Sequence, residues 1–511
     1  MPRSRNSDYG TLRGSLAPER DSASIIEDVI VMIIVMALAA VMRLWKLGEW
    51  SFWADEIFTV QDAQRFPSLI NVNPVVYIIV NYVTRSIGLS EWSARLGPCI
   101  IGIISVPALY WPARRMFNSK VAAIACLFLV FHPWHIFWSQ NVRAYSLAFL
   151  FAGLSASLFY LALERDNSWL TFLSLLTMLI SIASYTQTVL LIPALVVYVI
   201  LIMLLPAGIP RGLNGKNLII FFGPFILGLI FLLIPSVRNY IYSGWGLNQL
   251  GRSPLYIVFT LLYGLSIPMA VAAFVGGIHS FTYMHRGGLF MICYAVVPFI
   301  ALLIISPFFN VAGYYLFFTM PAFLMLAAFC ASELTESTAR SSRILSIAVI
   351  LIVLVSFFAQ DYLYFNKENG GRPKWRAAFE TLNSRMNAGD TLVISMPRIA
   401  QYYLKKPLIT SSVGNPVMQL EDVKSRIGNL ESLWKWEGRD IWFMLDELSL
   451  KSLDKDRSFR EWVYANCRMI KEFPVYARVS DRSITLWHAA YEKPKAEIES
   501  EESFEFEEFT F

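Results

Sequence analysis

The sequence predicts a polytopic α-helical membrane protein with a small α/β domain after its last span. Of the 511 residues, 56% are hydrophobic and only 16% are charged, whereas soluble domains average about 45–50% and about 25%. The apolar residues gather in long runs, and a run of about 20 residues crosses a bilayer as a helix. After residue 360 the runs stop, and short β-like and helical stretches alternate. We therefore expect a membrane domain over 25–360 and a soluble α/β domain over 361–491.

The N-terminal segment, 1–24, is polar and carries the arginines Arg3, Arg5, Arg13 and Arg20 ahead of the first apolar run at 29–44. This run is longer than the apolar core of a signal peptide, and no small-residue cleavage site follows it, so we expect a retained first helix. Basic residues before a first span favour a cytoplasmic N-terminus. The loop that follows, 46–92, is then predicted to lie on the outer face of a cell membrane.

Ten further apolar runs have spanning length, which makes eleven predicted spans. They lie at about 93–112, 120–138, 146–163, 168–187, 189–205, 217–235, 254–276, 287–306, 313–331 and 343–360. A shorter run, 74–88, contains Asn81 and Arg85 and is interpreted as a juxtamembrane helix. With that assignment most loop lysines and arginines fall on the cytoplasmic side, as the positive-inside rule requires. The chain after Gln360 is then extracytoplasmic.

The part after Gln360 shows four β-like runs, at 391–395, 407–410, 441–445 and 483–487, and helical stretches at 375–386 and 456–467. Alternating strands and helices are typical of a small α/β domain. Its basic first residues, 372–376, are interpreted as a helix start after Pro373, with a contact to lipid headgroups or donor phosphate as the alternative. The last residues, 492–511, are rich in Glu and Phe and are predicted to be a disordered acidic tail.

Carboxylates are scarce in the predicted outer loops of the membrane domain. All of them lie in the first loop, as Glu49, Asp55, Glu56, Asp62 and Glu91. Asp55 and Glu56 are adjacent and follow a segment rich in tryptophan and phenylalanine. Acid–base chemistry by this domain on that face would therefore depend on the first loop.

Other classes of site find little support in the sequence. Four of the five cysteines lie in apolar runs, so no disulfide framework is expected. His132 and His135 flank Pro133, but no third ligand is nearby, and we predict no metal site there. No nucleotide-binding glycine motif, P-loop or nucleophile elbow occurs. We also expect no nucleic-acid partner.

The order of these features is similar to that of a known family. An Asp-Glu pair follows the first span, with Asn-Pro-Val-Val-Tyr at 73–77, Ser-Glu-Trp-Ser-Ala-Arg-Leu at 90–96 and Ser-Gln-Asn-Val-Arg-Ala-Tyr at 139–145. Over roughly 25–165 this resembles the GT-C glycosyltransferases, particularly the protein O-mannosyltransferase and aminoarabinose-transferase branch. The resemblance implies a polyprenyl-phosphate sugar donor, an acceptor reached from the outer face, and the Asp of the pair as catalytic base.

The residue types suit that chemistry. A carboxylate can take the proton from an acceptor hydroxyl as it attacks the anomeric carbon, and we assign this role to Asp55. Glu56 would either raise the proton affinity of Asp55 by like-charge repulsion or orient a second substrate hydroxyl. Arg143 is the candidate ligand of the leaving phosphate, because a guanidinium binds phosphate oxygens in pairs. Gln140 and Tyr145 are candidate hydrogen-bond donors beside it.

Further candidate substrate contacts are Trp53, Arg95, Arg238 and Trp245. Arg95 is expected to pair with Glu91, either structurally or at the donor site. The sequence leaves open whether a divalent cation assists, which sugar moves, and whether the acceptor is a glycan, a lipid or a protein. A transporter or flippase of lipid-linked sugars is the alternative function. The near absence of Asp and Glu from the spans, and of internal repeats, favours the transferase.

Overall fold

The computed structural model describes residues 22–67, 73–244, 253–336, 340–387, 390–404, 417–419, 440–477 and 480–490. The chain divides into two compact units. The first comprises Met1–Leu47 and Asp62–Asp361, and the second comprises Gly48–Gln61 and Tyr362–Phe511. The segment that carries Asp55 and Glu56 therefore groups with the C-terminal part of the chain.

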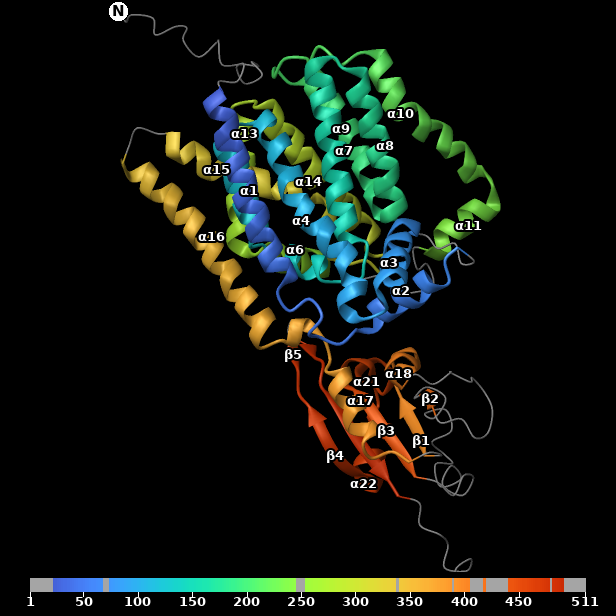
Figure 1. Ribbon diagram of the computed structural model, residues 1–511. Helices are drawn as coiled ribbons and strands as arrows, with labels where there is room; N and C mark the ends of the chain where they lie inside the picture. The colour runs from blue at the N-terminus through green and yellow to red at the C-terminus, as the bar shows by residue number, and fades with distance from the viewer. Residues whose placement is uncertain are drawn as a thin grey trace, which may run out of the picture. The chain divides into compact units, whose positions relative to one another are not determined.

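The first unit is a bundle of helices (Figure 1). Their bounds are α1 Ser22–Leu44, α3 Pro74–Ile87, α4 Glu91–Met116, α5 Ser119–Val130, α6 Pro133–Ser139, α7 Tyr145–Arg165, α8 Ser168–Ser184, η1 Thr186–Leu190, α9 Leu191–Leu204, α10 Gly215–Ile230, η2 Phe231–Leu233, α11 Pro235–Gly244, α12 Pro254–Leu265, α13 Ile267–Thr282, α14 Arg286–Ile305, η3 Gly313–Thr319, α15 Met320–Glu336 and α16 Arg340–Asn366. α2, Ala54–Gln64, begins in the second unit. All eleven predicted apolar runs are helical over most of their length.

Six helices among the described residues are long and apolar enough to cross a membrane, or up to eight if each of two bent helix pairs counts as one span. α8 and α10 are apolar but shorter, with 17 and 16 residues. α3, with 14 residues, is not among the candidate spans, and it covers most of the predicted juxtamembrane helix. A chain with several spans is confirmed, while the number eleven stays a prediction.

Two predicted spans are broken rather than continuous. α5 and α6 meet at 60°, and α12 and α13 meet at 98°. Pro133 is the first residue of α6, and a proline inside a helix lacks the N–H that the ladder needs. Between α12 and α13, Ser266 has a φ of 66° and is followed two residues later by Pro268. A positive φ stops a right-handed helix, so the chain turns sharply at that point.

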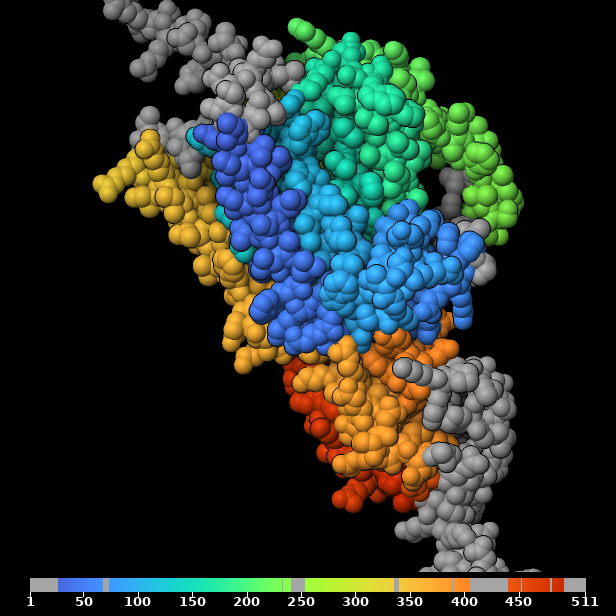
Figure 2. All heavy atoms as spheres, in the orientation of Figure 1, coloured from blue at the N-terminus to red at the C-terminus, as the bar shows by residue number. Residues whose placement is uncertain are grey.

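α4 lies at the centre of the packing in the first unit, against α1, α3, α5 and α7. Figure 2 shows α1 lying along α4 at the surface of the bundle. The outward side of α1 is almost entirely apolar and includes Ile30, Ile33 and Val41, each more than half exposed. Such a surface is unusual for a soluble protein. It fits a helix that contacts lipid.

The second unit is built on a five-stranded sheet with the order β2-β1-β3-β7-β4 (Figure 1). Its strands are β1 Thr391–Ile394, β2 Val417–Gln419, β3 Ile441–Asp446, β4 Arg468–Phe473 and β7 Ile484–Ala489. β1 is parallel to β2 and β3, whereas β7 is antiparallel to β3 and β4. A two-stranded ribbon joins β5 Tyr476–Ala477 to β6 Ser480–Asp481. The helices are η4 Asn369–Gly371, α17 Trp375–Asn383, α18 Pro397–Leu404, α21 Glu447–Leu453 and α22 Ser458–Asn466.

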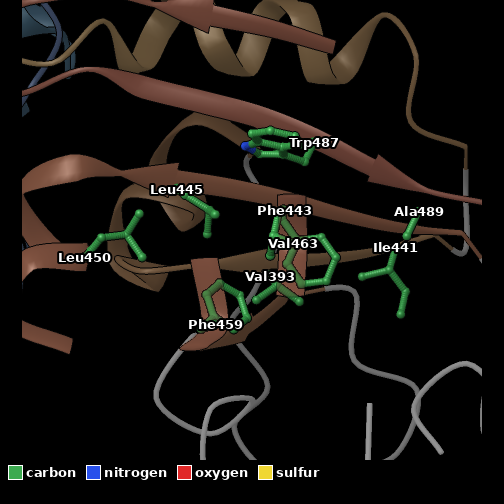
Figure 3. Close-up of a cluster of buried hydrophobic side chains, with 9 residues drawn as sticks. All are labelled: Val393, Ile441, Phe443, Leu445, Leu450, Phe459, Val463, Trp487 and Ala489. Atoms are coloured by element: carbon green, nitrogen blue, oxygen red, sulfur yellow. The ribbon is translucent and has the colours of Figure 1, made fainter. Parts of the chain in front are cut away.

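One face of the sheet forms the core of this unit, because alternate side chains of a strand point to the same side. Figure 3 shows Ile441, Phe443 and Leu445 of β3 gathered with Phe459 and Val463 of α22. Three of the four predicted strands and both predicted helices are present, and 407–410 lies outside the described residues, as does the predicted tail at 492–511. The sequence did not predict β4, an edge strand whose side chains are mostly exposed and partly charged.

Candidate active site

The segment ahead of the Asp-Glu pair is held by the second unit's own residues. Arg376 anchors its start: the guanidinium donates to the carbonyl oxygens of Gly48 and Glu49, at 3.3 and 3.2 Å. The backbone N–H of Arg376 donates to Ser51 Oγ at 2.9 Å. The hydroxyl oxygen of Tyr403 accepts a hydrogen bond from the backbone N–H of Phe52 at 3.0 Å. These bonds fix the backbone over 48–52.

Trp50 fastens the same segment through its ring. Its centroid lies 5.0 Å from that of Tyr364 and 5.9 Å from that of Phe365. Gly370 also lies against this ring; it has a φ of 62° and carries no side chain. A Cβ at this position would overlap the Trp50 ring. The close approach therefore requires glycine at residue 370.

Glu56 is paired with a residue that sequence reasoning did not assign to it. Arg372 Nε donates to Glu56 Oε2 at 3.1 Å, and both side chains are 0% exposed. Arg372 also donates to the carbonyl oxygen of Gly370 at 2.6 Å and lies over the Trp50 ring, 5.6 Å from its centroid. Burial lowers the pKa of Arg372, but the charge of Glu56 and contacts with Tyr364 outweigh it, so the pKa is raised above its ordinary value. Arg372 therefore stays charged.

Asp55 occupies the first turn of α2, next to Glu56. Its side chain is half-buried, whereas that of Glu56 is fully buried. Its backbone carbonyl accepts the hydroxyl of Thr59 at 3.0 Å, a bond within α2. Trp53, also half-buried, directs its backbone N–H to Glu56 Oε2 at 3.4 Å. Of the two adjacent carboxylates, Asp55 is thus the one that solvent reaches.

Two sequence-predicted residues of the first unit hold the end of α1. The amide of Gln140 donates to the carbonyl oxygens of Arg43 and Trp45, at 2.9 and 2.7 Å. Arg95, 0% exposed, donates to the carbonyl oxygen of Leu47 at 3.0 Å. An amide nitrogen has two hydrogens, so both donors of Gln140 are used by Arg43 and Trp45. Both side chains therefore contact backbone carbonyls at or just after the end of α1.

Arg143 and Tyr145 lie where α7 begins. Arg143 is half-buried. The pKa of Tyr77 is raised by burial and by the charge of Asp62, while the charge of Arg143 lowers it. All three groups are therefore within electrostatic reach of one another. Tyr145 is buried and stacks on Trp138 with a centroid distance of 3.7 Å.

Two further candidate contacts were predicted in the loop between the helices that follow α9. Arg238 is exposed on α11, and Trp245 lies outside the described residues. Within the part of the chain that the structure describes, no group of three or more His, Cys, Asp and Glu side chains could hold a metal ion. A ligand set for the divalent cation that the sequence left open is not found there.

The contact that the sequence did not reveal is the pairing of Arg372 with Glu56. Its only local signal is the basic stretch 372–376, which we interpreted as a helix start. Indeed α17 begins at Trp375. The arginines of this stretch, Arg372 and Arg376, also bind the segment 48–56. The two paired residues are 316 positions apart, and no local pattern reports such a contact.

Comparison with known proteins adds a family match over part of the chain and a fold. Residues 71–209 match the family model of dolichyl-phosphate-mannose-protein mannosyltransferases. No curated protein matches the chain. The crystal structure of apo ArnT from Cupriavidus metallidurans is similar with a TM-score of 0.57 at 14% identity, over 91% of this chain and 98% of ArnT.

Two ligand-bound structures are also similar. ArnT bound to undecaprenyl phosphate has a TM-score of 0.55 at 15% identity, over 92% of this chain and 98% of ArnT. The oligosaccharyltransferase AglB from Archaeoglobus fulgidus, in complex with an inhibitory peptide and a dolichol-phosphate, has a TM-score of 0.53 at 10% identity, over 84% of this chain and 70% of AglB. At such low identity these likenesses establish the fold. The chain is an integral membrane protein, and its predicted resemblance to the GT-C glycosyltransferases, in the mannosyltransferase and ArnT branch, is confirmed.

Proposed function

We propose that the protein transfers a sugar from a polyprenyl-phosphate donor to an acceptor hydroxyl on the outer face of the membrane. The observation that carries the proposal is that the two adjacent carboxylates have different environments. Glu56 is buried and neutralised by Arg372, whereas Asp55 is accessible to solvent. The match to a mannosyltransferase family, and the lipid phosphates bound by ArnT and AglB, support a lipid-linked donor.

In this proposal Asp55 is the catalytic base. The acceptor oxygen attacks the anomeric carbon while Asp55 takes the hydroxyl proton. The bond between the anomeric carbon and the phosphate oxygen breaks, and its electron pair leaves with the polyprenyl phosphate. Attack from the side opposite the leaving group inverts the anomeric configuration.

Glu56 acts in this proposal as a positioning residue. Of the two roles that the sequence left open, repulsion of Asp55 is weakened, because Arg372 balances the charge of Glu56 at 3.1 Å. Orientation of a substrate hydroxyl is disfavoured by complete burial. The ion pair instead fixes the first turn of α2, and so the direction of the Asp55 side chain.

Donor recognition is proposed to use Arg143 and the apolar helices of the first unit. Arg143 is half-buried, so its guanidinium can reach a phosphate. A groove of about 710 Å³ lies among α12, α13, α14 and α15 and is lined by apolar residues, including Leu261, Phe274 and Phe299. An apolar groove of this kind suits part of a polyprenyl chain. Gln140 is left out of the donor contacts, since its amide holds the end of α1.

The test is sugar transfer by the purified protein in detergent. The donors are radiolabelled polyprenyl-phosphate mannose, glucose and arabinose, and the acceptor is an extract of outer-face glycans, lipids and proteins. Asp55→Asn is compared with Glu49→Gln, which removes an exposed carboxylate from the same segment. Transfer by the native protein and Glu49→Gln, but not by Asp55→Asn, supports the proposal.

Two results contradict it in different ways. Equal transfer by Asp55→Asn and the native protein would keep the enzyme and reject Asp55 as base. Donor movement across proteoliposomes without any transfer would favour the flippase. The proposed topology, with the N-terminus in the cytoplasm and the second unit outside, is tested by adding protease to sealed vesicles of known orientation.

A further inference from the structure

Four buried polar side chains of the first unit have no place in the proposed chemistry. They are Arg43 of α1, His132 and His135 at the break between α5 and α6, and Asp361 of α16. We call these four residues the crossing cluster. None is more than 4% exposed. Ionisable groups inside a membrane bundle are costly to bury and usually serve a function.

Arg43 joins α1 to the broken helix. Its guanidinium donates to the carbonyl oxygens of Leu129 and Val130 at the end of α5, at 2.9 and 3.2 Å. It also lies 2.9 Å from Nδ1 of His135, in the first turn of α6. The carbonyls at a helix end lack partners in the next turn, and Pro133 supplies no N–H. Arg43 therefore adds side-chain donors to carbonyl oxygens at the break, where the backbone donor of Pro133 is missing.

Asp361 faces the same break from α16. Phe357, four residues earlier and thus on the same helix face, is fully buried, and its ring centroid lies 4.7 Å from that of His132. Asp361 is 4% exposed, and neither carboxylate oxygen has a hydrogen-bond partner among the described residues. Arg43 Nε and His135 Nε2 are likewise buried without partners.

Arg43 contacts His135 at 2.9 Å, and Asp361 lies one turn along α16 from Phe357, which packs on His132, so both charged groups border the same break. The carboxylate oxygens of Asp361 have no hydrogen-bond partner among the described residues. A guanidinium and a carboxylate that are buried close together but not in contact are stabilised when water bridges them. The unpartnered atoms provide both donors and acceptors for such bridges.

The position of the cluster in the chain is the decisive observation. Arg43 lies four residues before Leu47, where the first unit ends, and Asp361 is the last residue before the second unit resumes. Within the second unit the two emerging segments meet again, since Trp50 packs on Tyr364 at 5.0 Å. The chain passes from the first unit to the second after Leu47 and after Asp361, and both of these passages therefore begin at or near the crossing cluster.

We propose that the crossing cluster is a hydrated polar joint that holds both passages in register, and that Arg43 and Asp361 are thereby positioning residues for Asp55. The kinetic part of this inference rests on the proposed function. The joint acts through the backbone from α1 to α2 and through the contact of Arg372 with Glu56. An error of about 1 Å in the placement of a catalytic group can cost on the order of 100-fold in rate.

Hydrogen–deuterium exchange of the full-length protein in detergent tests the joint without reference to activity. Asp361→Asn removes the charge and keeps the shape. Its matched control is Glu164→Gln, which removes a carboxylate from the Arg286–Glu164 pair, 2.8 Å apart and also within the bundle. We expect exchange over 44–61 to be at least several-fold faster in Asp361→Asn than in the native protein. In Glu164→Gln we expect exchange over 44–61 to be unchanged. Unchanged exchange over 44–61 in Asp361→Asn would overturn the joint.

Transfer kinetics test the positioning. We expect kcat per folded molecule to fall on the order of tenfold or more in Asp361→Asn, with the KM for donor within about twofold, and Asp361→Glu to recover much of the loss. Faster exchange with an unchanged kcat would overturn the positioning role. If Asp361→Asn does not fold, the same exchange and kinetic measurements are made on Arg43→Lys. Lysine keeps the positive charge but lacks the planar set of N–H donors of the guanidinium. Absence of transfer by the native protein would reject the proposed function, while the exchange result would still decide the joint.

Discussion

Removal of the Arg372 guanidinium should destabilise the second unit far more than removal of any exposed charge. Arg372→Met keeps the aliphatic stem and deletes the bonds to Glu56 at 3.1 Å and to the carbonyl of Gly370 at 2.6 Å. The carboxylate of Glu56 would remain fully buried, with the backbone N–H of Trp53 at 3.4 Å. Breaking a buried pair in this way costs about 3–5 kcal/mol. Both partners are 0% exposed, so solvent screening does not reduce this figure.

In the unfolding equilibrium this corresponds to a factor of roughly 100 to 4,000, at about 1.4 kcal/mol for each tenfold step. Pulse proteolysis across a urea series, in detergent, would report the fraction of the second unit that is unfolded. The matched control is Arg460→Met, which breaks the Arg460–Glu447 pair of the same unit. That pair is 2.7 Å long but 25% and 14% exposed, so its removal should cost no more than about 1–2 kcal/mol.

A double-mutant cycle separates the ion pair from simple packing. Glu56→Leu with Arg372→Met replaces both charges by apolar side chains, which often costs little. We therefore expect the double variant to be more stable than the sum of the two single losses predicts. Additive losses, or a loss in Arg372→Met no larger than in Arg460→Met, would refute the inference that this pair fixes the carboxylate segment.

The other predictions concern the same segment and the donor. Asp55→Asn should lower the transfer rate on the order of 10²–10⁴-fold while urea unfolding stays as in the native protein; a stability loss of the same size would show that Asp55 is structural. Gly370→Ala should destabilise the second unit by at least about 1–2 kcal/mol, because residue 370 has a φ of 62° and a Cβ would overlap Trp50; native stability by pulse proteolysis would contradict the required close approach. Arg143→Ala should raise the KM for donor more than the KM for acceptor, and equal effects on both would reject the phosphate contact.

Much of the architecture could be predicted because its signals are local. A run of apolar residues predicts a membrane-spanning helix by its length and composition alone, and every predicted span is helical over most of its length. The Asp-Glu pair and the short stretches at 73–77, 90–96 and 139–145 are contiguous, and they sufficed for the resemblance that the comparisons confirm. Strands β1, β3 and β7 are buried runs of apolar residues, which local composition also reveals.

The tertiary structure alone decided which polar groups are engaged. The sequence predicted Gln140 as a candidate hydrogen-bond donor near the phosphate, and in the fold its amide donates to the backbone carbonyls of Arg43 and Trp45. Glu56 and Asp55 are neighbours of similar chemistry, and only the approach of Arg372, 316 residues away, separates their environments. Hydrogen bonds and ion pairs depend on distances of a few tenths of an ångström between groups that the chain brings together only on folding. Sequence therefore determined which segments are long and apolar and where the carboxylates lie along the chain, and folding determined that Arg372 pairs with Glu56.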